Sequence, residues 1–545
     1  MFRDEKKGLS IGPAKLTLLA AWFLITFCNF SFWSAAFKVI GTDSATHIGF
    51  LIAIYVLLIT WLNQALSILL LPWLFKPLLT IFLIGAASTA YFMDTYGVMI
   101  DKEMVRNTLM TDPREATELL NWKMVLYFGL LALLPSVLLW KTLIAYSSFG
   151  KEIGKKLGLV VLTIAVSGAI GAKYYADFAS FARNNTYIRH MIVPVNYIGA
   201  ISSYITSTLQ GGKIVVSPTG ADATKGQKLT ADSNRKTLTI IVVGEAARAQ
   251  SFSLNGYARE TNPELSKLDI INYPHVSSCG TETAVSVPCM FSKFTRAEYS
   301  DSKAKRNENL VDVLNHAGFS LLWRDNNSSS RGVAVRVGEE NVQSLTIPDI
   351  CHDGECFDDI LLYKLQDYVD KLSNDGVIIL HQKGSHGPAY YLRSPEKYKK
   401  FLPECKTNQL QECPRQDLIN AYDNTIVYTD HVLSEIIAFL QKNNAKFDTA
   451  MWYLADHGES TGEKGIYLHA APYMIAPKEQ THIGMIQWFS DSFLQRMKLD
   501  KSCLQQQAGK DYSQDNLFHS VLGLLDVKTT AYDKQLDMFA NCMKP

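Results

Sequence analysis

Five long stretches without charged side chains lie before residue 180, and they constrain the fold more than any other feature of the chain. A helix crosses the hydrocarbon core of a membrane with about 17–25 apolar residues. We therefore predict five membrane-spanning helices; the alternative is a set of buried core helices in a soluble protein. The charge-free stretches cover residues 16–37, 48–75, 77–93, 124–140 and 157–172. Lys76 and Pro77 separate the second from the third, which predicts a tight turn there.

Lysine and arginine residues orient these spans, because cytoplasmic segments of membrane proteins carry an excess of them. The segments predicted to lie inside carry Arg3, Lys6, Lys7, Lys15, Lys141, Lys151, Lys155 and Lys156. The alternate loops carry Lys38, Lys102, Arg106, Arg114 and Lys123. This bias favours an internal N-terminus, so everything after the fifth span is predicted to lie outside. The net charge of +1 gives no global field that would attract nucleic acid.

The cysteines also indicate an external compartment for the second half of the chain. Cys28 lies within the first predicted span, and the other eight follow residue 270. An even number confined to one region indicates disulfides formed under oxidising conditions. Pairing close neighbours predicts Cys279–Cys289, Cys351–Cys356 and Cys405–Cys413, which leaves Cys503–Cys542 as a long-range bond. A zinc-ribbon arrangement stays open as an alternative, although no CxxC pair is present.

Composition divides the chain into three parts. Residues 178–210 alternate aromatic and polar side chains, which is typical of a segment at the membrane interface. Residues 211–236 are rich in Gly, Ser, Thr, Asp and Lys and are predicted to form a linker. We expect a membrane domain over 1–177, an interfacial segment and linker over 178–236, and a soluble domain over 237–545.

The soluble part is predicted to be an α/β domain. Buried strands are expected at 237–243, 319–323, 376–380 and 450–455, where the sequence is continuously apolar and rich in β-branched residues. Helices are expected at 309–317, 358–372 and 417–442. Apolar strands that alternate with helices indicate a mostly parallel sheet with helices on both faces.

Polar residues follow each predicted strand, and ligands of open α/β sheets bind beyond the carboxyl ends of the strands. They include Glu245, Asn327, His381, His386, Asp456, His457 and, farther on, His469. Carboxylates and imidazoles are the ligands that zinc accepts. Asp456 and His457 would face opposite sides of a continuing strand, so both reach one ion only if the chain leaves the sheet, and Gly458 permits such a turn. Each residue alone is more often a capping or surface group.

The stretch SCGTETAVSVPCMF, residues 278–291, places two threonines and a glutamate between Cys279 and Cys289. A hydroxyl on a metal ion is activated as metal-bound water is, so a threonine held there could be a nucleophile. A stapled turn whose threonines cap backbone groups is the alternative, and this segment alone leaves both open.

Seven motifs give the chain a resemblance to a known family, the lipid A phosphoethanolamine transferases, which include the mobile colistin-resistance enzymes. The motifs are GEAAR at 244–248, NGYARETNP at 255–263, SCGTETAVSVPCMFS at 278–292, WRDNN at 323–327, GSHGPAYY at 384–391, AYDNTIVYTD at 421–430 and ADHGES at 455–460 with GIYLH at 465–469. The resemblance implies an alkaline phosphatase/sulfatase-like fold in the periplasm, anchored in the bacterial inner membrane. It also implies transfer of phosphoethanolamine from phosphatidylethanolamine to a lipid A phosphate, which would give resistance to cationic peptides such as polymyxin.

The resemblance further implies roles for individual residues. Thr283 would be the nucleophile, and Glu245, Thr283, Asp456 and His457 would hold one zinc ion. His386 and His469 match positions of a second, variably occupied zinc and of the substrate phosphate. Asn327 and His381 would line the phosphoethanolamine pocket.

Two residues depart from the family pattern. Relatives usually carry Lys where Arg331 stands; Arg keeps the charge and offers a bidentate fork to phosphate, so we expect Arg331 to bind phosphate. Relatives usually carry Ala where Glu282 stands beside the nucleophile, and we expect this carboxylate to point outward.

Other functions stay open as alternatives. The acceptor could be core heptose or a periplasmic glucan, or the chain could be a phosphoglycerol transferase of the same fold. A sulfatase would need a C/S-x-P-x-R nucleophile motif, which CGTETAV lacks. A catalytically inactive anchored protein is the alternative of another class. The sequence predicts membrane lipids as partners and defines no oligomeric state.

Overall fold

The computed structural model describes residues 10–69, 72–111, 117, 119–209, 215–231, 235–352 and 355–544. The chain divides into two compact units, Met1–Met110 with Leu120–Thr208 and Thr111–Leu119 with Leu209–Pro545. Arg3, Lys6, Lys7 and Arg114, which contributed to the predicted orientation, lie outside the described residues. That orientation stays a prediction, as do the domain boundaries at 177 and 236.

The first unit is a set of apolar helices. Among the described residues, four are long and apolar enough to cross a membrane: Ala45–Leu69 (α3), Phe75–Tyr96 (α4), Trp122–Lys141 and Phe149–Tyr175, the apolar part of α9 (Phe149–Asn184). The span Trp122–Lys141 consists of α7 (Trp122–Phe128), η1 (Gly129–Leu133) and α8 (Leu134–Lys141). A fifth is counted if α1 (Pro13–Phe27) and α2 (Phe30–Ile40) form one broken span. Trp61, Ile84 and Leu133 are among their large exposed side chains, as expected of helices that face lipid.

The first predicted span was wrong as a single helix, because α1 and α2 meet at an angle of 64°. Asn29 lies at the break and is buried. Its Nδ2 donates to the carbonyl oxygens of Leu24 at 2.8 Å and Val193 at 3.0 Å. An amide side chain that binds nearby backbone competes with the helical hydrogen-bond ladder, which accounts for the bend.

The predicted turn at Lys76 and Pro77 was also wrong, because both residues lie in the first turn of α4. Proline is tolerated there since the first N–H groups of a helix have no partner within it. After α9 the chain continues through η2 (Thr186–Met191) and α10 (Val195–Leu209). Within α9 the backbone is non-helical at Tyr174.

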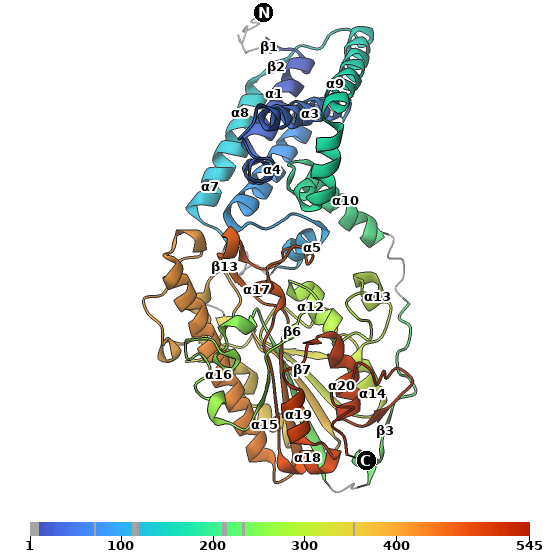
Figure 1. Cartoon of the computed structure of the whole chain (residues 1–545), viewed down its shortest axis with the longest axis vertical. Coiled ribbons are helices and arrows are strands. Elements are labelled where there is room, and N and C mark those ends of the chain that lie inside the picture. Colours follow the sequence, from blue (N-terminus) through green and yellow to red (C-terminus); the bar gives the residue numbers. More distant parts are fainter. Residues whose placement is uncertain are drawn as a thin grey trace, which may run out of the picture. The chain divides into compact units, whose positions relative to one another are not determined.

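The second unit is built on a seven-stranded sheet (Figure 1). Its strands, in spatial order, are β5 (Ile271–Tyr273), β15 (Met485–Phe489), β12 (Phe447–Ala455), β4 (Lys236–Gly244), β11 (Gly376–His381), β7 (Ser320–Asp325) and β8 (Glu339–Asn341). The run from β12 to β8 is parallel, whereas β15 is antiparallel to both of its neighbours. The predicted mostly parallel sheet is therefore confirmed.

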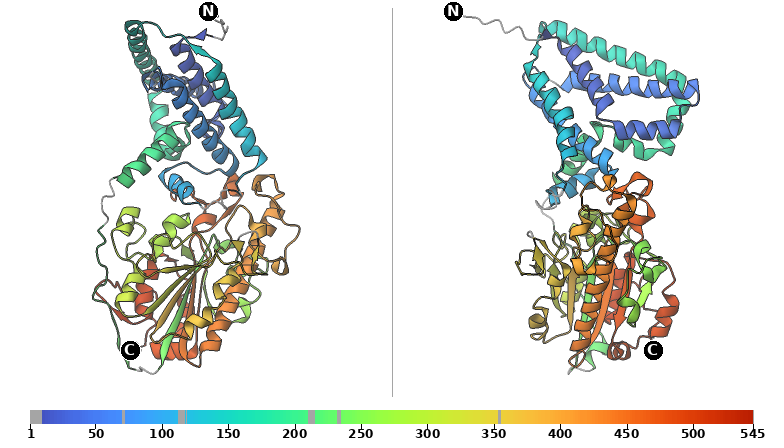
Figure 2. Two further views of the ribbon diagram at one scale, coloured as in Figure 1. Left: turned by 180° about the vertical axis from the view of Figure 1, so that it is seen from behind. Right: turned by 90° about the vertical axis from the view of Figure 1, so that its left-hand side faces the viewer.

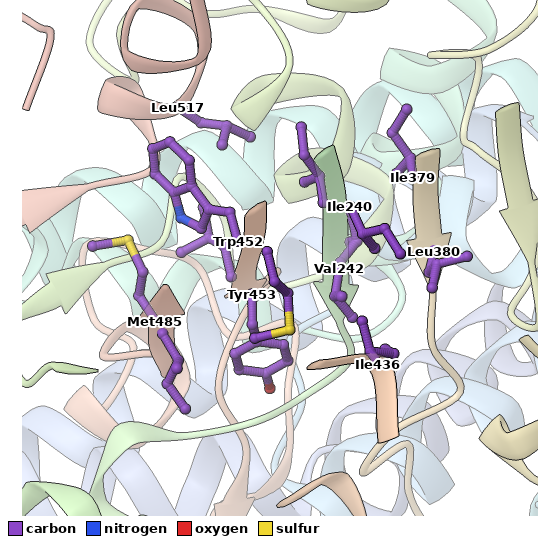
Figure 3. Close-up of a cluster of buried hydrophobic side chains, with 14 of the residues drawn as sticks. Ile240, Val242, Ile379, Leu380, Ile436, Trp452, Tyr453, Met485 and Leu517 are labelled. Atoms are coloured by element: carbon purple, nitrogen blue, oxygen red, sulfur yellow. The ribbon is translucent and has the colours of Figure 1, made fainter. Parts of the chain in front are cut away.

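Helices cover both faces of this sheet (Figure 1 and Figure 2). Helix α16 (Arg415–Asn443) lies on one face, and α14 (Leu310–His316) and α20 (Asp515–Leu524) lie on the other. Side chains of adjacent strand residues alternate between these faces: Trp452 points toward Leu517 of α20, and Tyr453 points toward Ile436 of α16 (Figure 3). The central strands β4, β11 and β12 are buried on both faces, which explains why their sequences are largely apolar.

Smaller elements complete the two units, with α5, β1 and β2 in the first unit and the others in the second. The short helices are α5 (Lys102–Met110), α11 (Gln227–Thr230), α12 (Thr283–Met290), α13 (Asp301–Lys305), α15 (Leu365–Val369), α17 (Lys478–Thr481), α18 (Asp491–Met497) and α19 (Lys501–Gln507). Two-residue ribbons pair β1 (Ser10–Ile11) with β2 (Leu143–Ile144), β3 (Thr224–Lys225) with β17 (Val527–Lys528), β6 (Val276–Ser277) with β16 (Tyr512–Ser513), β9 (Cys351–His352) with β10 (Glu355–Cys356), and β13 (Ser460–Thr461) with β14 (Tyr467–Leu468). The helix predicted over 358–372 is instead the 3-10 turn η6 (Asp358–Leu362) followed by α15, because Lys364 between them takes a left-handed φ of 53°.

All four predicted disulfides are present. The bonds join Cys279 to Cys289, Cys351 to Cys356, Cys405 to Cys413 and Cys503 to Cys542. The remaining cysteine, Cys28, is free and buried in the first unit. The pairing of near neighbours therefore predicted three bonds correctly, and the two cysteines that it left over form the fourth.

Candidate metal centre and active site

The candidate centre forms where two adjacent parallel strands end. Ala455 of β12 pairs in register with Gly244 of β4, so Asp456 and Glu245 leave the sheet side by side. The backbone N–H of Ala246 donates to Asp456 Oδ1 at 3.1 Å, which ties the two chain segments together. Because β12 ends at Ala455, Asp456 and His457 are freed from strand alternation and both face one centre.

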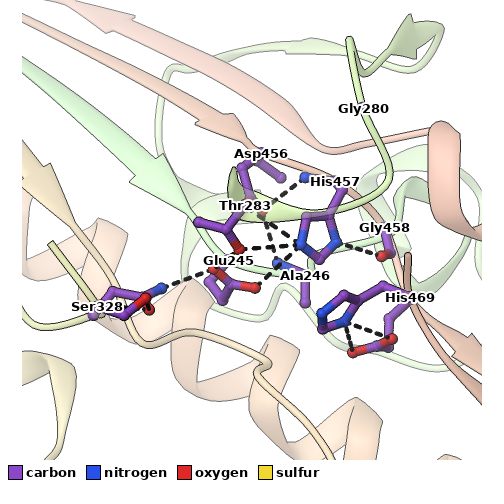
Figure 4. A network of polar contacts seen from close by, with 12 residues as sticks. Glu245, Ala246, Gly280, Thr283, Ser328, Asp456, His457, Gly458 and His469 are labelled. Atoms are coloured by element: carbon purple, nitrogen blue, oxygen red, sulfur yellow. Dashed lines mark hydrogen bonds and ion pairs between the residues drawn. The ribbon is translucent and has the colours of Figure 1, made fainter. Parts of the chain in front are cut away.

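Glu245, Asp456 and His457 bring their ligand atoms within 4.8 Å of one another (Figure 4). His457 Nε2 lies 3.4 Å from Glu245 Oε1 and 3.4 Å from Asp456 Oδ2. All three side chains are fully buried. Apart from these contacts with His457, Glu245 Oε1 and Asp456 Oδ2 have no hydrogen-bond partner among the described residues. Two buried carboxylate oxygens and an imidazole nitrogen directed at one point are suited to a divalent cation.

Thr283 completes this cluster. It is the first residue of α12, and its Oγ1 lies 3.1 Å from Glu245 Oε2 and 3.4 Å from His457 Nε2. The disulfide Cys279–Cys289 links the loop before α12 to the helix's last turn. A Cβ at Gly280 would lie 2.9 Å from Ser286 Oγ, so only glycine fits this tight loop. The stapled turn and the positioned hydroxyl are thus features of the same segment.

The charges of the cluster shift the pKa values of its members. Burial and the negative charge of Glu245 raise the pKa of Asp456 to about 6. Burial opposes ionisation of Glu245 too, but the hydrogen bond and charge of His457 outweigh it and hold the pKa of Glu245 well below its ordinary value. Burial lowers the pKa of His457, and the two carboxylates outweigh burial and raise it to about 10. A positive charge between the carboxylates of Glu245 and Asp456 therefore stabilises the cluster. A proton on His457 or a bound cation supplies this charge.

A second group of residues lies beside this cluster. The rings of His457 and His469 are 4.4 Å apart between centroids, and those of His386 and His469 are 5.8 Å apart. His469 Nδ1 lies 3.3 Å from both carboxylate oxygens of Glu459, which is fully buried (Figure 4). Two imidazoles and a carboxylate are again ligand types that zinc accepts.

Comparisons with known proteins decide the family. Residues 237–527 match the sulfatase family model, and residues 58–209 match the model described as phosphoethanolamine transferase EptA/EptB. Phosphoethanolamine transferase EptA of Salmonella typhimurium is 39% identical over 546 residues, which is 100% of both chains. The chain belongs to the phosphoethanolamine transferase family. It is therefore an enzyme of the alkaline phosphatase/sulfatase superfamily, as its sequence motifs indicated.

Two further relatives agree with this assignment. Phosphatidylethanolamine transferase Mcr-1 of Escherichia coli is 38% identical over 501 residues, covering 88% of this chain and 90% of the relative. The solved structure of the integral membrane protein lipooligosaccharide phosphoethanolamine transferase A from Neisseria meningitidis superposes with a TM-score of 0.95 at 36% identity. That match covers 98% of this chain and 100% of the other, so the apolar helices and the α/β domain both belong to the family's fold.

Asn327 joins this transferase's centre directly. Its Nδ2 donates to Glu245 Oε2 at 2.7 Å and to the carbonyl oxygen of Gln382 at 2.9 Å. His381 is fully buried, and its Nδ1 lies 2.7 Å from Asp325 Oδ2. Arg331 follows on the loop after Asn327 and takes a left-handed φ of 50°. The Nη2 of Arg331 donates to Ser328 Oγ, so this guanidinium is held by its own loop rather than by the carboxylates of the centre.

The expectation for Glu282 was wrong, because this side chain is only 4% exposed. It precedes α12 with extended backbone and makes no capping hydrogen bond to that helix. Sequence reasoning also passed over Glu459 and Asp325. Each lies within a motif used for the resemblance, three residues after Asp456 and two before Asn327, and each binds a histidine of the site. For Glu459 the available signal was its position two residues after His457, whereas Asp325 lies 56 residues from His381 in the sequence and gave no such signal.

Proposed function

We propose that this transferase moves phosphoethanolamine from phosphatidylethanolamine to a phosphate of lipid A through a covalent intermediate on Thr283. The observation that carries the proposal is the buried hydroxyl of Thr283 beside Glu245 and His457, at 3.1 and 3.4 Å. A hydroxyl so placed is suited to nucleophilic catalysis, and the family's name specifies the group that it transfers.

The residues present fit zinc, because two buried carboxylates, an imidazole and a hydroxyl converge. Glu245, Thr283, Asp456 and His457 would hold one ion, and His386 and His469 with Glu459 would hold a second. Zinc, when bound, would lower the pKa of the Thr283 hydroxyl and neutralise negative charge around the phosphate.

In the first step the Thr283 oxygen attacks phosphorus and the bond to the diacylglycerol oxygen breaks. Glu245 Oε2, which accepts the hydrogen bond of the Thr283 hydroxyl, is placed to receive its proton, and the proton ends on the departing diacylglycerol. Thr283 lies at the start of α12, where helix N–H groups favour the negative charge of a phosphoryl group. Asn327 Nδ2 keeps Glu245 in place during this transfer.

In the second step a phosphate oxygen of lipid A attacks the same phosphorus, and the bond to Thr283 breaks. Thr283 regains its proton from the acceptor. Arg331 is the residue suited to bind a phosphate of either lipid through its bidentate fork. The added ammonium group lowers the negative charge of lipid A, which weakens binding of cationic peptides such as polymyxin.

The names of the relatives support lipid substrates: Mcr-1 is a phosphatidylethanolamine transferase, and the Neisseria enzyme acts on lipooligosaccharide. A more distant relative, the Kdo(2)-lipid A phosphoethanolamine 7''-transferase of Escherichia coli, is 26% identical. Its name also specifies a lipid A substrate. Four disulfides and the apolar helices support a protein of the bacterial inner membrane whose catalytic domain lies in the periplasm.

Mass spectrometry of lipid A and of core glycans tests the proposal, with cells that express the wild type, Thr283→Ala or Thr283→Ser. We expect phosphoethanolamine on a lipid A phosphate for the wild type, none for Thr283→Ala and a reduced amount for Thr283→Ser. Modified lipid A with Thr283→Ala would exclude Thr283 as the nucleophile. Modification of heptose or glucan alone would assign another acceptor, and no modification or zinc binding at all would indicate an inactive anchored protein.

A further inference from the structure

Asp325 and His381 form a buried pair next to the candidate centre. Asp325 ends β7, His381 ends β11, and the two residues are paired in register across these parallel strands. Both side chains are 0% exposed. Asp325 Oδ2 lies 2.7 Å from His381 Nδ1 and accepts a second hydrogen bond from Trp323 Nε1 at 2.9 Å. A carboxylate oxygen accepts only, so His381 Nδ1 carries the hydrogen, and the pair fixes both ring orientation and tautomer.

The other oxygen of Asp325 holds the loop that follows β7. Asp325 Oδ1 accepts from the backbone N–H of Asn327 at 2.8 Å and of Ser329 at 3.1 Å. This loop presents the Asn327 amide to Glu245 and then leads to Arg331. The Asp325 carboxylate therefore sets the positions of both the His381 ring and the Asn327 amide, which are predicted to line the phosphoethanolamine pocket.

The second nitrogen of His381 is left for a ligand. Nε2 has no hydrogen-bond partner within the part of the chain that the structure describes, although the ring is fully buried. A buried polar atom without a partner costs about 1–3 kcal/mol, so the site is suited to a group that supplies one. Since Nδ1 faces β7, Nε2 is directed away from that strand, and β4 with Glu245 at its end lies on the other side of β11.

The charges around the ring agree with this direction. Burial lowers the pKa of His381, but the charge and hydrogen bond of Asp325, together with the charges of Glu245 and Asp456, raise it overall. The ring thus lies within the electrostatic reach of the two carboxylates of the centre. In that position Nε2 of a neutral His381 ring is a hydrogen-bond acceptor, and Nε2 of a protonated ring is a donor that can bind a phosphate oxygen.

We propose that Asp325 is a positioning residue of the transfer reaction: it holds His381 with Nε2 available to the transferred phosphate and holds the loop that presents Asn327. The proposal rests on the proposed function and adds a role for a residue outside the Glu245, Asp456 and His457 cluster. The substitution Asp325→Asn keeps one acceptor oxygen for the loop but places an N–H₂ group where His381 and Trp323 now donate.

Asp375 provides a matched control at the opposite ends of the same strands. It is also buried, accepts from the Thr237 backbone N–H at 2.8 Å and pairs with Lys225 at 2.6 Å. Register places it at the amino ends of β4, β7 and β11, away from the centre. Asp375→Asn should therefore lower stability by an amount similar to Asp325→Asn, without an effect on the reaction.

The test uses the full chain in detergent micelles with Asp325→Asn, His381→Gln, the double variant and Asp375→Asn. Turnover is measured as diacylglycerol release from phosphatidylethanolamine in the presence of lipid A. Affinity for O-phosphoethanolamine is measured by calorimetry, which needs no turnover. Zinc content and melting temperature are recorded for every variant.

We expect Asp325→Asn to lower kcat about 10–100-fold and to weaken binding of O-phosphoethanolamine, with zinc content unchanged. The kcat of the double variant should be about equal to that of the worse single variant, because both substitutions remove the same Asp325–His381 pair. Wild-type turnover and affinity in Asp325→Asn would overturn the proposal, as would kcat losses that simply multiply in the double variant. A wild type that binds O-phosphoethanolamine but releases no diacylglycerol would refute the proposed function instead, and the calorimetry would still decide the role of Asp325.

Discussion

The hydroxyl oxygen of Thr283 lies 3.1 Å from Oε2 of Glu245, and both side chains are buried. Thr283 comes from the first turn of α12 and Glu245 from the end of β4, so packing of the helix against the sheet sets this distance. The other oxygen of Glu245 faces His457 Nε2 at 3.4 Å. One carboxylate thus contacts both the proposed nucleophile and a proposed zinc ligand, and a change in its charge should affect both.

Glu245→Gln is expected to lower zinc binding at least tenfold and transfer at least 100-fold, because it removes a negative charge while keeping the shape of the side chain. Zinc per protein, measured by mass spectrometry of metals, and diacylglycerol release check these effects. Asp448→Asn is the control, since Asp448 is buried and paired with Arg235 and Arg496 at the amino end of β12. Full zinc content in Glu245→Gln would contradict the ligand assignment.

Gly458→Ala is expected to abolish most zinc binding and activity for a steric reason. A Cβ at Gly458 would lie 2.0 Å from the carbonyl oxygen of Glu479, so the backbone after His457 would have to move. Gly509→Ala is the control, because nothing lies within 4 Å of a Cβ at that position. Zinc titration and melting curves of the two variants check the expectation. A Gly458→Ala protein with normal zinc affinity would show that the turn adapts.

Much of this centre could be predicted from the sequence because the fold fixes where strand ends meet. Glu245, His381 and Asp456 each follow a continuously apolar segment, and parallel strands place such residues at one edge. The three disulfides between near neighbours could also be predicted from the sequence. The bend at Asn29 and the burial of Glu282 were not, because both depend on tertiary neighbours. The Asp325–His381 hydrogen bond likewise depends on the register of β7 and β11, which no local pattern specifies.

Removal of disulfides is expected to destabilise the protein in the order of the loops that they close. Cys503 and Cys542 are 39 residues apart, and Cys351 and Cys356 are 5 apart. Loop-closure entropy predicts costs of about 4 and about 2 kcal/mol for the two bonds. Paired Cys→Ser variants, compared by melting temperature under non-reducing conditions, check this order. Equal melting temperatures for the two variants would mean that strain or residual structure outweighs loop length.

Glu355→Gln is expected to lower stability at neutral pH and to have little effect in acid. Burial opposes ionisation of Glu355, but Arg393 and Lys383 outweigh it and lower its pKa to about 2. Lys383 Nζ lies 3.0 Å from Glu355 Oε1, and the Glu355 side chain is 19% exposed. A folded pKa below the unfolded value stabilises the protein above about pH 4.5, by about 2–3 kcal/mol at pH 7, and this contribution disappears as the pH falls toward 2.

The difference in melting temperature between wild type and Glu355→Gln should therefore be large at pH 7, smaller at pH 4, less than half its full size at pH 3 and near zero only at about pH 2 and below. Glu396→Gln is the control, because Glu396 is 80% exposed and its pair with Lys399 is screened by solvent. Arg393 Nε also donates to the carbonyl oxygen of His386 at 2.8 Å, so loss of the Glu355 carboxylate should loosen the loop that carries His386. A melting difference that stays constant from pH 7 to pH 3 would show that the charge of Glu355 contributes nothing and that only its packing matters.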